Sequence, residues 1–333
     1  MAINRIKSVG VIGAGMAGLA CAEALQAAGI PVTLFEKSRG VGGRMATRRS
    51  ECGAAFDHGA QYFTVRDLRF REQVEQWCRA GTAALWLGRI IRLEQGVISE
   101  LNEPIDRYVG LPAMNSIAKS LASNFHVNLN CTIQSIHSFD DGWRLTDSNQ
   151  VLHGPFGRLV LAIPPQQAIQ LTQANLGATQ ALICDIELAP CWAVMVQFEQ
   201  RFDVPYDAAF VHQAPFTWVA RNSSKPGRDT SDCWVLHASP EWTKEHLEQP
   251  ADQVAGQLLD EFWHVTGQSP QPVAALAAHR WRFAIPRKPL QQRSIFEPKQ
   301  RLGLCGDWCG GPRIEGAFLS GIAMAEAILN SPS

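Results

Sequence analysis

The spacing of glycines near the start of the chain indicates a phosphate-binding turn. The turn reads Gly13-Ala14-Gly15-Met16-Ala17-Gly18, after an apolar stretch typical of a short buried strand and before a helical segment. In this context the first glycine permits a tight turn, the second lets the backbone approach a pyrophosphate and the third lets helix and strand pack closely. The helix N-terminus then faces the phosphate charge. We predict that these six residues bind a dinucleotide.

A carboxylate and a second glycine-rich loop extend this predicted site. The next apolar stretch, residues 32–35, ends in Glu36, where an acid can accept hydrogen bonds from an adenosine ribose. The chain continues through Lys37 into Gly43-Arg44-Met45. Glycine lets this backbone lie close to a ligand, and Arg44 can neutralise a diphosphate. A simple NAD-binding domain would continue into a helix here, so the loop favours FAD; a solvated surface loop is the alternative.

The C-terminal part of the chain carries a matching feature. Residues 301–305 are typical of an apolar strand that ends in Gly306-Asp307, and an apolar-faced helix is predicted over residues 314–329. Asp307 at the edge of a strand can hold ribityl hydroxyls. The helix N-terminus at Arg313 and Ile314 can stabilise the N1 and C2 carbonyl region of a reduced flavin. A purely structural strand-loop-helix unit is the alternative interpretation.

Together these motifs resemble the flavin-containing amine oxidase superfamily. Residues 56–64, 218–226 and 306–309 are similar, more narrowly, to the renalase-like proteins. The resemblance implies an α/β fold, in which a Rossmann-type FAD-binding domain carries an inserted mixed-sheet substrate domain, as in amine oxidases and p-hydroxybenzoate hydroxylase. It also implies that Gly59, Ala60, Gln61 and Val127 help to bind FAD. Because no cysteine motif for covalent attachment is evident, non-covalent FAD is expected.

The predicted domains are discontinuous. We expect the FAD-binding domain to comprise residues 1–65, 106–165 and 299–333, and the substrate domain to comprise residues 66–105 and 166–298. A helix is expected over residues 66–80, and another is expected to begin at Pro112, with Met114, Ile117, Ala118 and Leu121 as its core stripe. Residues 126–138 alternate as one strand would, with Leu129 on its apolar face.

The renalase-like resemblance implies a substrate and its binding residues. The substrate would be an isomeric 2- or 6-dihydro-NAD(P), oxidised to NAD(P) by hydride transfer to flavin N5, with oxygen reduced to hydrogen peroxide. Tyr62, Asn222, His237 and Trp281 lie in the matching motifs and offer hydrogen bonds and stacking to such a ring. Each residue also has a purely structural alternative. Tyr62 and Trp281 would be aromatic residues of the core, Asn222 a turn residue and His237 a strand histidine with its hydrogen bonds satisfied. Trp281 and Trp308 are also predicted to form an aromatic wall.

The same family pattern leaves other reactions open. The strand that carries a lysine in classical amine oxidases reads here as residues 190–198, without a lysine. A flavin amine oxidase, a desaturase of another small molecule and a non-catalytic FAD-binding or dinucleotide-binding protein remain alternatives, because one fold carries many chemistries. Arg39, Arg44, Arg48 and Arg49 form a basic run in which Arg44 is assigned to the FAD diphosphate. The other three suggest steering of an anionic substrate, or simply a solvated face.

Composition narrows the class of partner. Thirty Lys and Arg balance thirty-one Asp and Glu, so we expect a small-molecule partner and neither nucleic acid nor a membrane. No apolar run is long enough to span a bilayer and no signal peptide is recognised, so we expect a cytoplasmic monomer or weak homodimer. The spacing of Cys305 and Cys309 fits no zinc motif, and no metal site is predicted.

Overall fold

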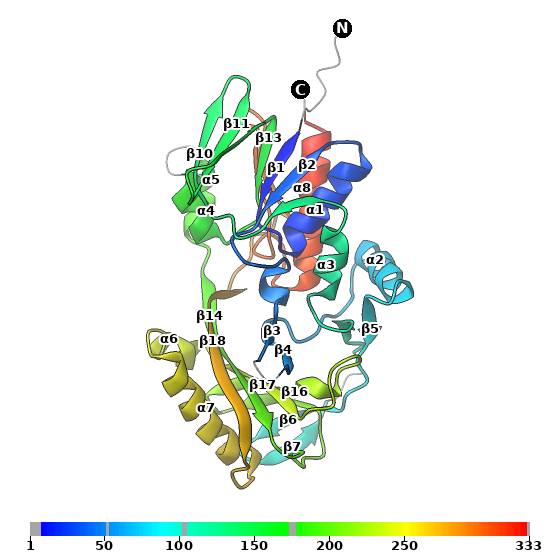
Figure 1. Cartoon of the computed structure of the whole chain (residues 1–333), viewed down its shortest axis with the longest axis vertical. Helices are drawn as coiled ribbons and strands as arrows, with labels where there is room; N and C mark the ends of the chain where they lie inside the picture. The colour runs from blue at the N-terminus through cyan, green and yellow to red at the C-terminus, as the bar shows by residue number, and fades with distance from the viewer. Residues whose placement is uncertain (1–7, 51–52, 102–104, 173–177, 332–333) are drawn as a thin grey trace.

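The protein is described by a computed structural model over residues 8–50, 53–101, 105–172 and 178–331. Two sheet-based units lie one above the other, and the long strands β14 (Leu188–Phe198) and β18 (Val273–Pro286) extend from the upper unit into the lower one (Figure 1). The predicted α/β class is confirmed. Within these described ranges, we find no helix with the length and apolar character that crossing a membrane requires.

A six-stranded sheet forms the upper unit. Its order is β19-β20-β13-β1-β2-β9, and its strands are parallel except for the edge strand β19. Their bounds are β1 Val9–Ile12, β2 Val32–Phe35, β9 His126–Asn128, β13 Arg158–Leu161, β19 Ile295–Glu297 and β20 Leu302–Leu304. The apolar strands are buried on both faces, as parallel strands usually are. This arrangement brings the loops that follow Ile12, Leu161 and Leu304 to one carboxyl edge of the sheet.

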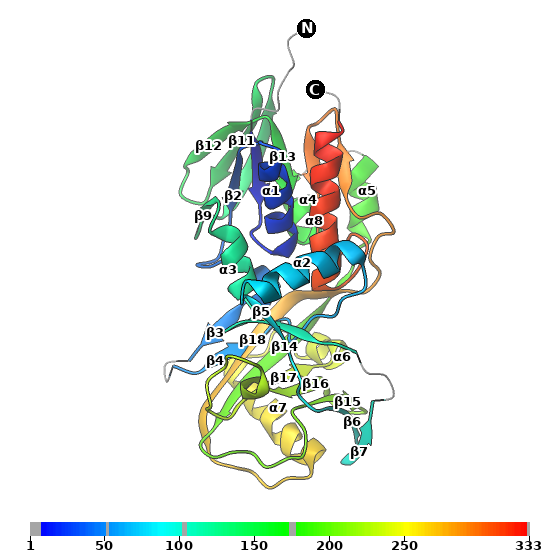
Figure 2. The same cartoon turned by 90° about the vertical axis from the view of Figure 1, so that its right-hand side faces the viewer.

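Helices and a small sheet cover the two faces of the six-stranded sheet. α1 (Met16–Ala27), α3 (Ser116–Ala122) and α8 (Ile314–Leu329) share one core with Val9, Val11 and Val160 (Figure 2). The opposite core combines Phe35 and Leu159 with an antiparallel sheet and two short helices. These elements are β10 Ile133–Phe139, β11 Gly142–Asp147, β12 Leu152–Phe156, α4 Pro165–Thr172 and α5 Ala178–Cys184.

A seven-stranded sheet of order β18-β14-β17-β16-β15-β6-β7 forms the lower unit. The remaining bounds are β6 Ile90–Glu94, β7 Val97–Glu100, β15 Ala208–His212, β16 Phe216–Arg221 and β17 Cys233–Ala238. α7 (Ala251–Thr266) packs Phe262 against Phe198 and Trp234 of this sheet, and α6 (Pro240–Glu245) lies beside it. The opposite face of the sheet therefore lies toward the upper unit.

Short elements connect the two units. They are β3 Thr47–Arg49 paired with β4 Ala55–Asp57, β5 Ala83–Leu85 paired with β8 Tyr108–Gly110, α2 Leu68–Arg79, and the 3-10 helices η1 Gly43–Met45 and η2 Asn222–Ser224. Phe70 and Trp77 of α2 pack on Phe318 of α8. The helix that we expected in the substrate domain thus lies on the upper unit, as do α4, α5 and β19.

Two expected elements differ in extent. The helix expected from Pro112 begins at Ser116, because the backbone N–H of Met114 donates to Asp57 Oδ1 at 3.0 Å and holds a loop instead. The single strand expected over residues 126–138 is wrong. β9 pairs with β2, whereas β10 pairs with β11, and Asn130 turns the chain between them with φ of 52°. Leu129 is consequently 41% exposed.

Candidate active site

A cavity of about 2490 Å³ is lined by residues of both units. Typical sites for one drug-sized ligand occupy about 300–1,000 Å³, so this cavity has room for a dinucleotide cofactor and a second molecule. Most of the predicted site residues lie in its wall: Gly13, Gly15, Met16, Ala17, Glu36, Lys37, Gly43, Arg44, Met45, Gly59, Ala60, Gln61, Tyr62, His237, Trp281, Asp307, Arg313 and Ile314. Ala14, Gly18, Val127 and Asn222 are not among its lining residues.

The glycine-rich turn has the geometry expected of a nucleotide-binding loop. Gly13 has a φ of 104°, and a Cβ there would lie 2.5 Å from Ala162 O. A Cβ on Gly18 would lie 2.0 Å from Gly13 O, so this glycine permits close packing within the turn. A Cβ on Gly15 would meet no atom within 4 Å, which leaves open space beside the start of α1. That space is where a diphosphate would meet the helix N-terminus.

Glu36 links the glycine turn to the end of β2. It is 7% exposed, and its carboxylate accepts backbone N–H groups from Ala14 at 3.0 Å and from Ser38 at 2.9 Å. A carboxylate has about four acceptor positions, so it can still accept from ribose hydroxyls. Ala14 therefore holds the Glu36 carboxylate in place by its backbone N–H and does not itself line the cavity.

Replacing Glu36 with Ala should weaken FAD binding. The substitution removes the acceptor for ribose hydroxyls, each such hydrogen bond being worth about 1 kcal/mol or somewhat more when the acceptor is charged. Titration of the apoprotein with FAD measures the change in Kd. Glu72→Ala, on the exposed side of α2, is the matched control and should bind FAD as the wild type does. Equal affinity of the two variants would exclude Glu36 as a ribose ligand.

Arg44 and Asp307 meet although they lie 263 positions apart in the sequence. The guanidinium donates to both carboxylate oxygens, at 2.8 Å and 2.7 Å, and also to Ala284 O at 2.9 Å. This fork fixes the start of the loop after β20 against η1. Since both Nη atoms are engaged in this way, contact of Arg44 with a diphosphate and of Asp307 with ribityl hydroxyls stay predictions.

Val127 does not reach the cavity. Its partly buried side chain packs against the core that includes α1 and α8, and β9 is a three-residue edge strand paired with β2. The chain enters the cavity wall after the following turn, at Cys131, Thr132, Ile133 and Gln134. No separate signal in the sequence marks this shift, because the turn at Asn130 interrupts what looks like one alternating strand.

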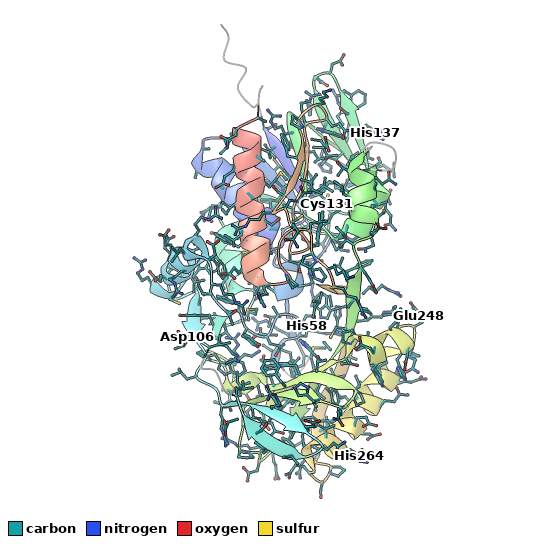
Figure 3. The ribbon with its side chains drawn as sticks, turned by 180° about the vertical axis from the view of Figure 1, so that it is seen from behind. His58, Asp106, Cys131, His137, Glu248 and His264 are labelled. Carbon is teal, nitrogen blue, oxygen red and sulfur yellow. The ribbon has the colours of Figure 1, made fainter. Side chains whose placement is uncertain are left out.

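Three histidines and Trp281 form the part of the cavity wall nearest to β17 and β18. The ring of His58 stacks on Trp281 with centroids 5.0 Å apart and meets His279 edge-on at 4.8 Å. His58 O lies 3.1 Å from His237 Nε2 and accepts from Trp281 Nε1 at 3.0 Å. Figure 3 shows His58 between the two units. The Nδ1 of His58 is a buried polar atom without a protein partner among the described residues, as expected of a group that faces a ligand site.

These histidines are neutral at physiological pH. Burial lowers the pKa of His237 to about 4, and burial together with His279 lowers the pKa of His58 to about 4. A carbonyl oxygen only accepts hydrogen bonds, so Nε2 of His237 carries the proton and Nδ1 is left as an acceptor. The site therefore offers an uncharged histidine acceptor rather than an imidazolium.

The free energy of unfolding should fall as the pH is lowered from about 6.5 to about 4. An unfolded histidine has a pKa near 6.5, so the unfolded chain binds protons in this window that folded His58 and His237 do not bind. The contribution of the two neutral histidines to the free energy of unfolding is fully present above about pH 6.5. Each histidine lowers that free energy by up to about 3 kcal/mol as the pH falls to about 4. Urea unfolding at about pH 6.5 and about pH 4 should show a smaller loss of unfolding free energy for His237→Gln than for the wild type. An unchanged loss would contradict a depressed pKa at His237.

Asn222 lies behind the wall in a buried ionic cluster that the sequence did not predict. Its amide donates to Ala55 O at 2.8 Å and accepts from Lys225 Nζ at 3.1 Å. Lys225 has no exposed side-chain surface and also donates to Gln61 Oε1 at 3.1 Å. Substrate contact by Asn222 is not part of this arrangement and stays a prediction.

Asp57 is the counter-charge of this cluster. Its Oδ2 accepts from Arg228 and lies 3.7 Å from Lys225 Nζ. Burial opposes ionisation of Asp57, but Lys225 and Arg228 outweigh it and lower the pKa of the carboxyl. Burial lowers the pKa of Lys225 to about 8, against the opposing pull of Asp57. Two cations thus share one carboxylate directly behind Gln61.

Positive charge dominates the cavity wall. Among the residues that the structure describes, the wall holds twelve Lys and Arg side chains but only two acidic ones, Glu36 and Asp307. From the upper unit and its connecting loops come Lys37, Arg39, Arg44, Arg48, Arg49, Arg66, Arg107, Lys119 and Arg313, and from the lower sheet come Arg92, Arg280 and Arg282. The protein as a whole has a formal charge of −1, so the excess is local to this site. A concave surface of one sign concentrates ligands of the opposite sign.

Aromatic side chains flank this cationic space. Tyr62 lies against Trp218 with ring centroids 5.3 Å apart, and Arg107 covers the Tyr62 ring at 5.3 Å. Trp308 also touches the cavity but is 1% exposed and donates to Ile163 O, so most of its ring belongs to the core. The predicted aromatic surface is formed more by Tyr62, Trp218 and Trp281 than by Trp308.

Comparison with known proteins gives two matching family models. Residues 11–79 match an NAD(P)-binding Rossmann-like domain, and residues 75–329 match the flavin containing amine oxidoreductase model. A tRNA 5-methylaminomethyl-2-thiouridine biosynthesis bifunctional protein of Magnetococcus marinus is 24% identical over 79% of this chain and 44% of its own length. A 4,4'-diapophytoene desaturase of Staphylococcus haemolyticus is 45% identical over 18% of this chain and 12% of its own length. The chain thus spans less than half of either relative.

Solved structures share the whole fold at low sequence identity. A protein named as a protoporphyrinogen oxidase from Exiguobacterium sp. 255-15 superposes with a TM-score of 0.77 and 13% identity, covering 97% of this chain and 99% of that one. A putrescine oxidase bound to putrescine gives a TM-score of 0.73 and 13% identity over the same shares of the two chains. At this identity the likeness concerns the fold alone.

Proposed function

Because this chain belongs to the flavin containing amine oxidoreductase family, we propose that it is an FAD-dependent oxidase of an anionic dihydronicotinamide dinucleotide. The proposed substrates are the 2- and 6-dihydro isomers of NAD(P). Overall, a dihydronicotinamide, dioxygen and a proton give the oxidised nicotinamide and hydrogen peroxide. The observation that carries the proposal is the ratio of twelve basic to two acidic side chains among the described residues of the cavity wall.

The described residues fit FAD. The open space at Gly15, the buried acceptor Glu36 and the carboxylate of Asp307 lie along one cavity. The proposed binding of FAD there is non-covalent. FAD, when bound, supplies the two-electron acceptor. Its diphosphate would use only part of the positive charge. Arg280 and Arg282 are paired with Glu248, so Arg48, Arg92 and the wall cations outside these ion pairs remain for a second diphosphate, that of the substrate.

The same charges disfavour a simple amine. Putrescine, which the related oxidase structure contains, is a cation at neutral pH, and a wall of Lys and Arg repels cations. The strand β14 also lacks the lysine of classical amine oxidases. The nicotinamide ring, by contrast, is planar and carries an amide. It suits the rings of Tyr62 and Trp281, and its amide N–H groups suit the acceptor Nδ1 of His237.

Anaerobic mixing with candidate donors tests the substrate class. FAD-loaded protein is mixed separately with 2- or 6-dihydro-NAD, ordinary NADH and putrescine while the visible absorbance of oxidised flavin is followed. We expect rapid bleaching with the dihydro isomers. Bleaching by putrescine alone would favour an amine oxidase, and bleaching by none of these donors would favour a desaturase or a non-catalytic flavoprotein. Oxygen uptake with the active donor then tests whether oxygen is the acceptor.

A further inference from the structure

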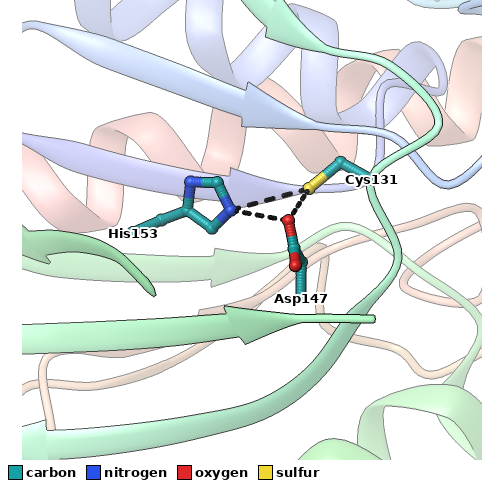
Figure 4. Close-up of side chains that lie close together, drawn as sticks. All are labelled: Cys131, Asp147 and His153. Atoms are coloured by element: carbon teal, nitrogen blue, oxygen red, sulfur yellow. Dashed lines mark hydrogen bonds and ion pairs between the residues drawn. The ribbon is translucent and has the colours of Figure 1, made fainter. Parts of the chain in front are cut away.

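Three side chains with metal-binding atoms lie together near the nucleotide end of the cavity. Cys131 stands in the turn between β9 and β10, Asp147 ends β11 and His153 lies in β12. Figure 4 shows the three side chains pointing toward one another, and Figure 3 shows Cys131 in the upper unit, away from His58. The cluster is therefore separate from the histidines near Trp281.

The distances between the three atoms suit one small ion. His153 Nε2 lies 3.0 Å from Asp147 Oδ2, and Cys131 Sγ lies 3.6 Å from that oxygen and 3.9 Å from that nitrogen. Zinc binds sulfur at about 2.3 Å and nitrogen or oxygen at about 2.0–2.2 Å in a tetrahedron, which places an N–O pair about 3.4 Å apart and an S–N or S–O pair about 3.6 Å apart. Each observed separation is within about half an ångström of that geometry.

Neighbouring groups hold these atoms in place. Asp147 Oδ1 accepts backbone N–H groups from Asn149 at 2.8 Å and Val151 at 3.0 Å, which leaves Oδ2 for the cluster. The ring of Phe35 packs edge-on against His153 at 5.0 Å. The backbone N–H of Cys131 donates to Glu36 O at 2.9 Å. Such outer contacts are what orient metal ligands in established sites.

We propose that Cys131, Asp147 and His153 bind one Zn²⁺ ion, with water from the cavity as the fourth ligand. The mixed sulfur, nitrogen and oxygen set is characteristic of zinc and unsuited to Ca²⁺ or Mg²⁺, which prefer oxygen alone. Zinc displaces the thiol proton, which leaves to solvent. Cys131 lies in the cavity wall, so the ion has an entry path. This inference does not depend on the proposed substrate.

The ion would clamp the nucleotide end of the cavity. Cys131 is followed by Thr132 to Gln134, which line the cavity, and Asp147 and His153 belong to the β11–β12 hairpin on the opposite side of the cluster. Joining them through one ion fixes the wall segment against the hairpin. A ligand that binds only the folded protein also raises its thermal stability.

Zinc content and X-ray absorption of the FAD-loaded protein test this site. The protein is equilibrated with Zn²⁺ and dialysed against a weak chelator, and metal is measured by mass spectrometry. We expect one zinc per chain, with one sulfur ligand at about 2.3 Å and nitrogen or oxygen ligands at about 2.0–2.2 Å. Cys131→Ser and His153→Gln should each bind zinc at least about tenfold more weakly and lose the rise in melting temperature.

Two variants control for adventitious binding. Cys184→Ser removes an exposed thiol and His137→Gln an exposed histidine of β10, and both should retain zinc as the wild type does. Wild-type protein without bound zinc would overturn the proposal, as would equal retention by Cys131→Ser. Zinc bound without a sulfur ligand would also overturn it, and this absorption result does not depend on any variant folding correctly.

Discussion

Asp57→Asn should destabilise the protein by about 3–5 kcal/mol, because it leaves Lys225 and Arg228 buried without a counter-charge. The side chains of Lys225 and Arg228 are 0% and 3% exposed, so water cannot replace the lost carboxylate. Asp57 Oδ1 also accepts hydrogen bonds from Thr47 Oγ1 and from the Met114 N–H, and the latter holds the loop before α3. The substitution weakens both hydrogen bonds because a neutral amide oxygen is a poorer acceptor than a carboxylate. Urea unfolding at neutral pH measures the change in the free energy of unfolding.

A second substitution separates charge from packing in this experiment. If an unpaired cation causes the loss, then Lys225→Met in the Asp57→Asn background should restore part of the stability, since one buried charge is removed. Asp106→Asn, at an exposed carboxylate, should stay within about 0.5 kcal/mol of the wild type. A double variant that is no more stable than Asp57→Asn would show that the two cations are not the source of the loss.

Local spacing made the nucleotide end of the site predictable. The β1-α1-β2 segment, its three glycines and Glu36 follow one another within 28 residues, Val9 to Glu36, and each has a steric or hydrogen-bonding reason for its position. A reader of the sequence can therefore place them without knowing the rest of the fold. The single strand expected over residues 126–138 was wrong because the turn with a positive φ at Asn130 looks, in sequence, like the continuation of an alternating strand, and FAD contact by Val127 stays a prediction.

Contacts between segments that lie far apart in the chain could not be predicted from the sequence. Classical amine oxidases carry a lysine in the strand that corresponds to β14, whereas in this chain the buried Lys225 lies outside that strand and reaches Gln61 across 164 positions. Nothing local distinguishes Lys225 from a solvated turn lysine. The Cys131, Asp147 and His153 cluster is equally hidden, because it depends on the register of β11 and β12 and follows no spaced motif.

Flavin reduction by a dihydronicotinamide isomer should be about five-fold to over a hundred-fold slower in His237→Ala than in the wild type. Under the proposed function, Nδ1 of the neutral His237 accepts from the substrate amide and orients its ring. Hydride donation depends on near-attack geometry, so losing an orienting hydrogen bond costs about 1–3 kcal/mol of the barrier even though no proton moves. Stopped-flow absorbance measures this rate, and FAD titration should show a much smaller change.

Two other variants show whether the effect belongs to His237. His212→Ala removes another histidine of the cavity wall, one that is exposed at the end of β15, and it should reduce at nearly the wild-type rate. Asn222 was expected from the sequence to offer hydrogen bonds to the substrate ring, but its amide binds Ala55, Asp57 and Lys225. The effect of Asn222→Ala should therefore appear in protein stability as well as in rate. Reduction of His237→Ala at the wild-type rate would mean that His237 does not orient the substrate, whichever donor proves active.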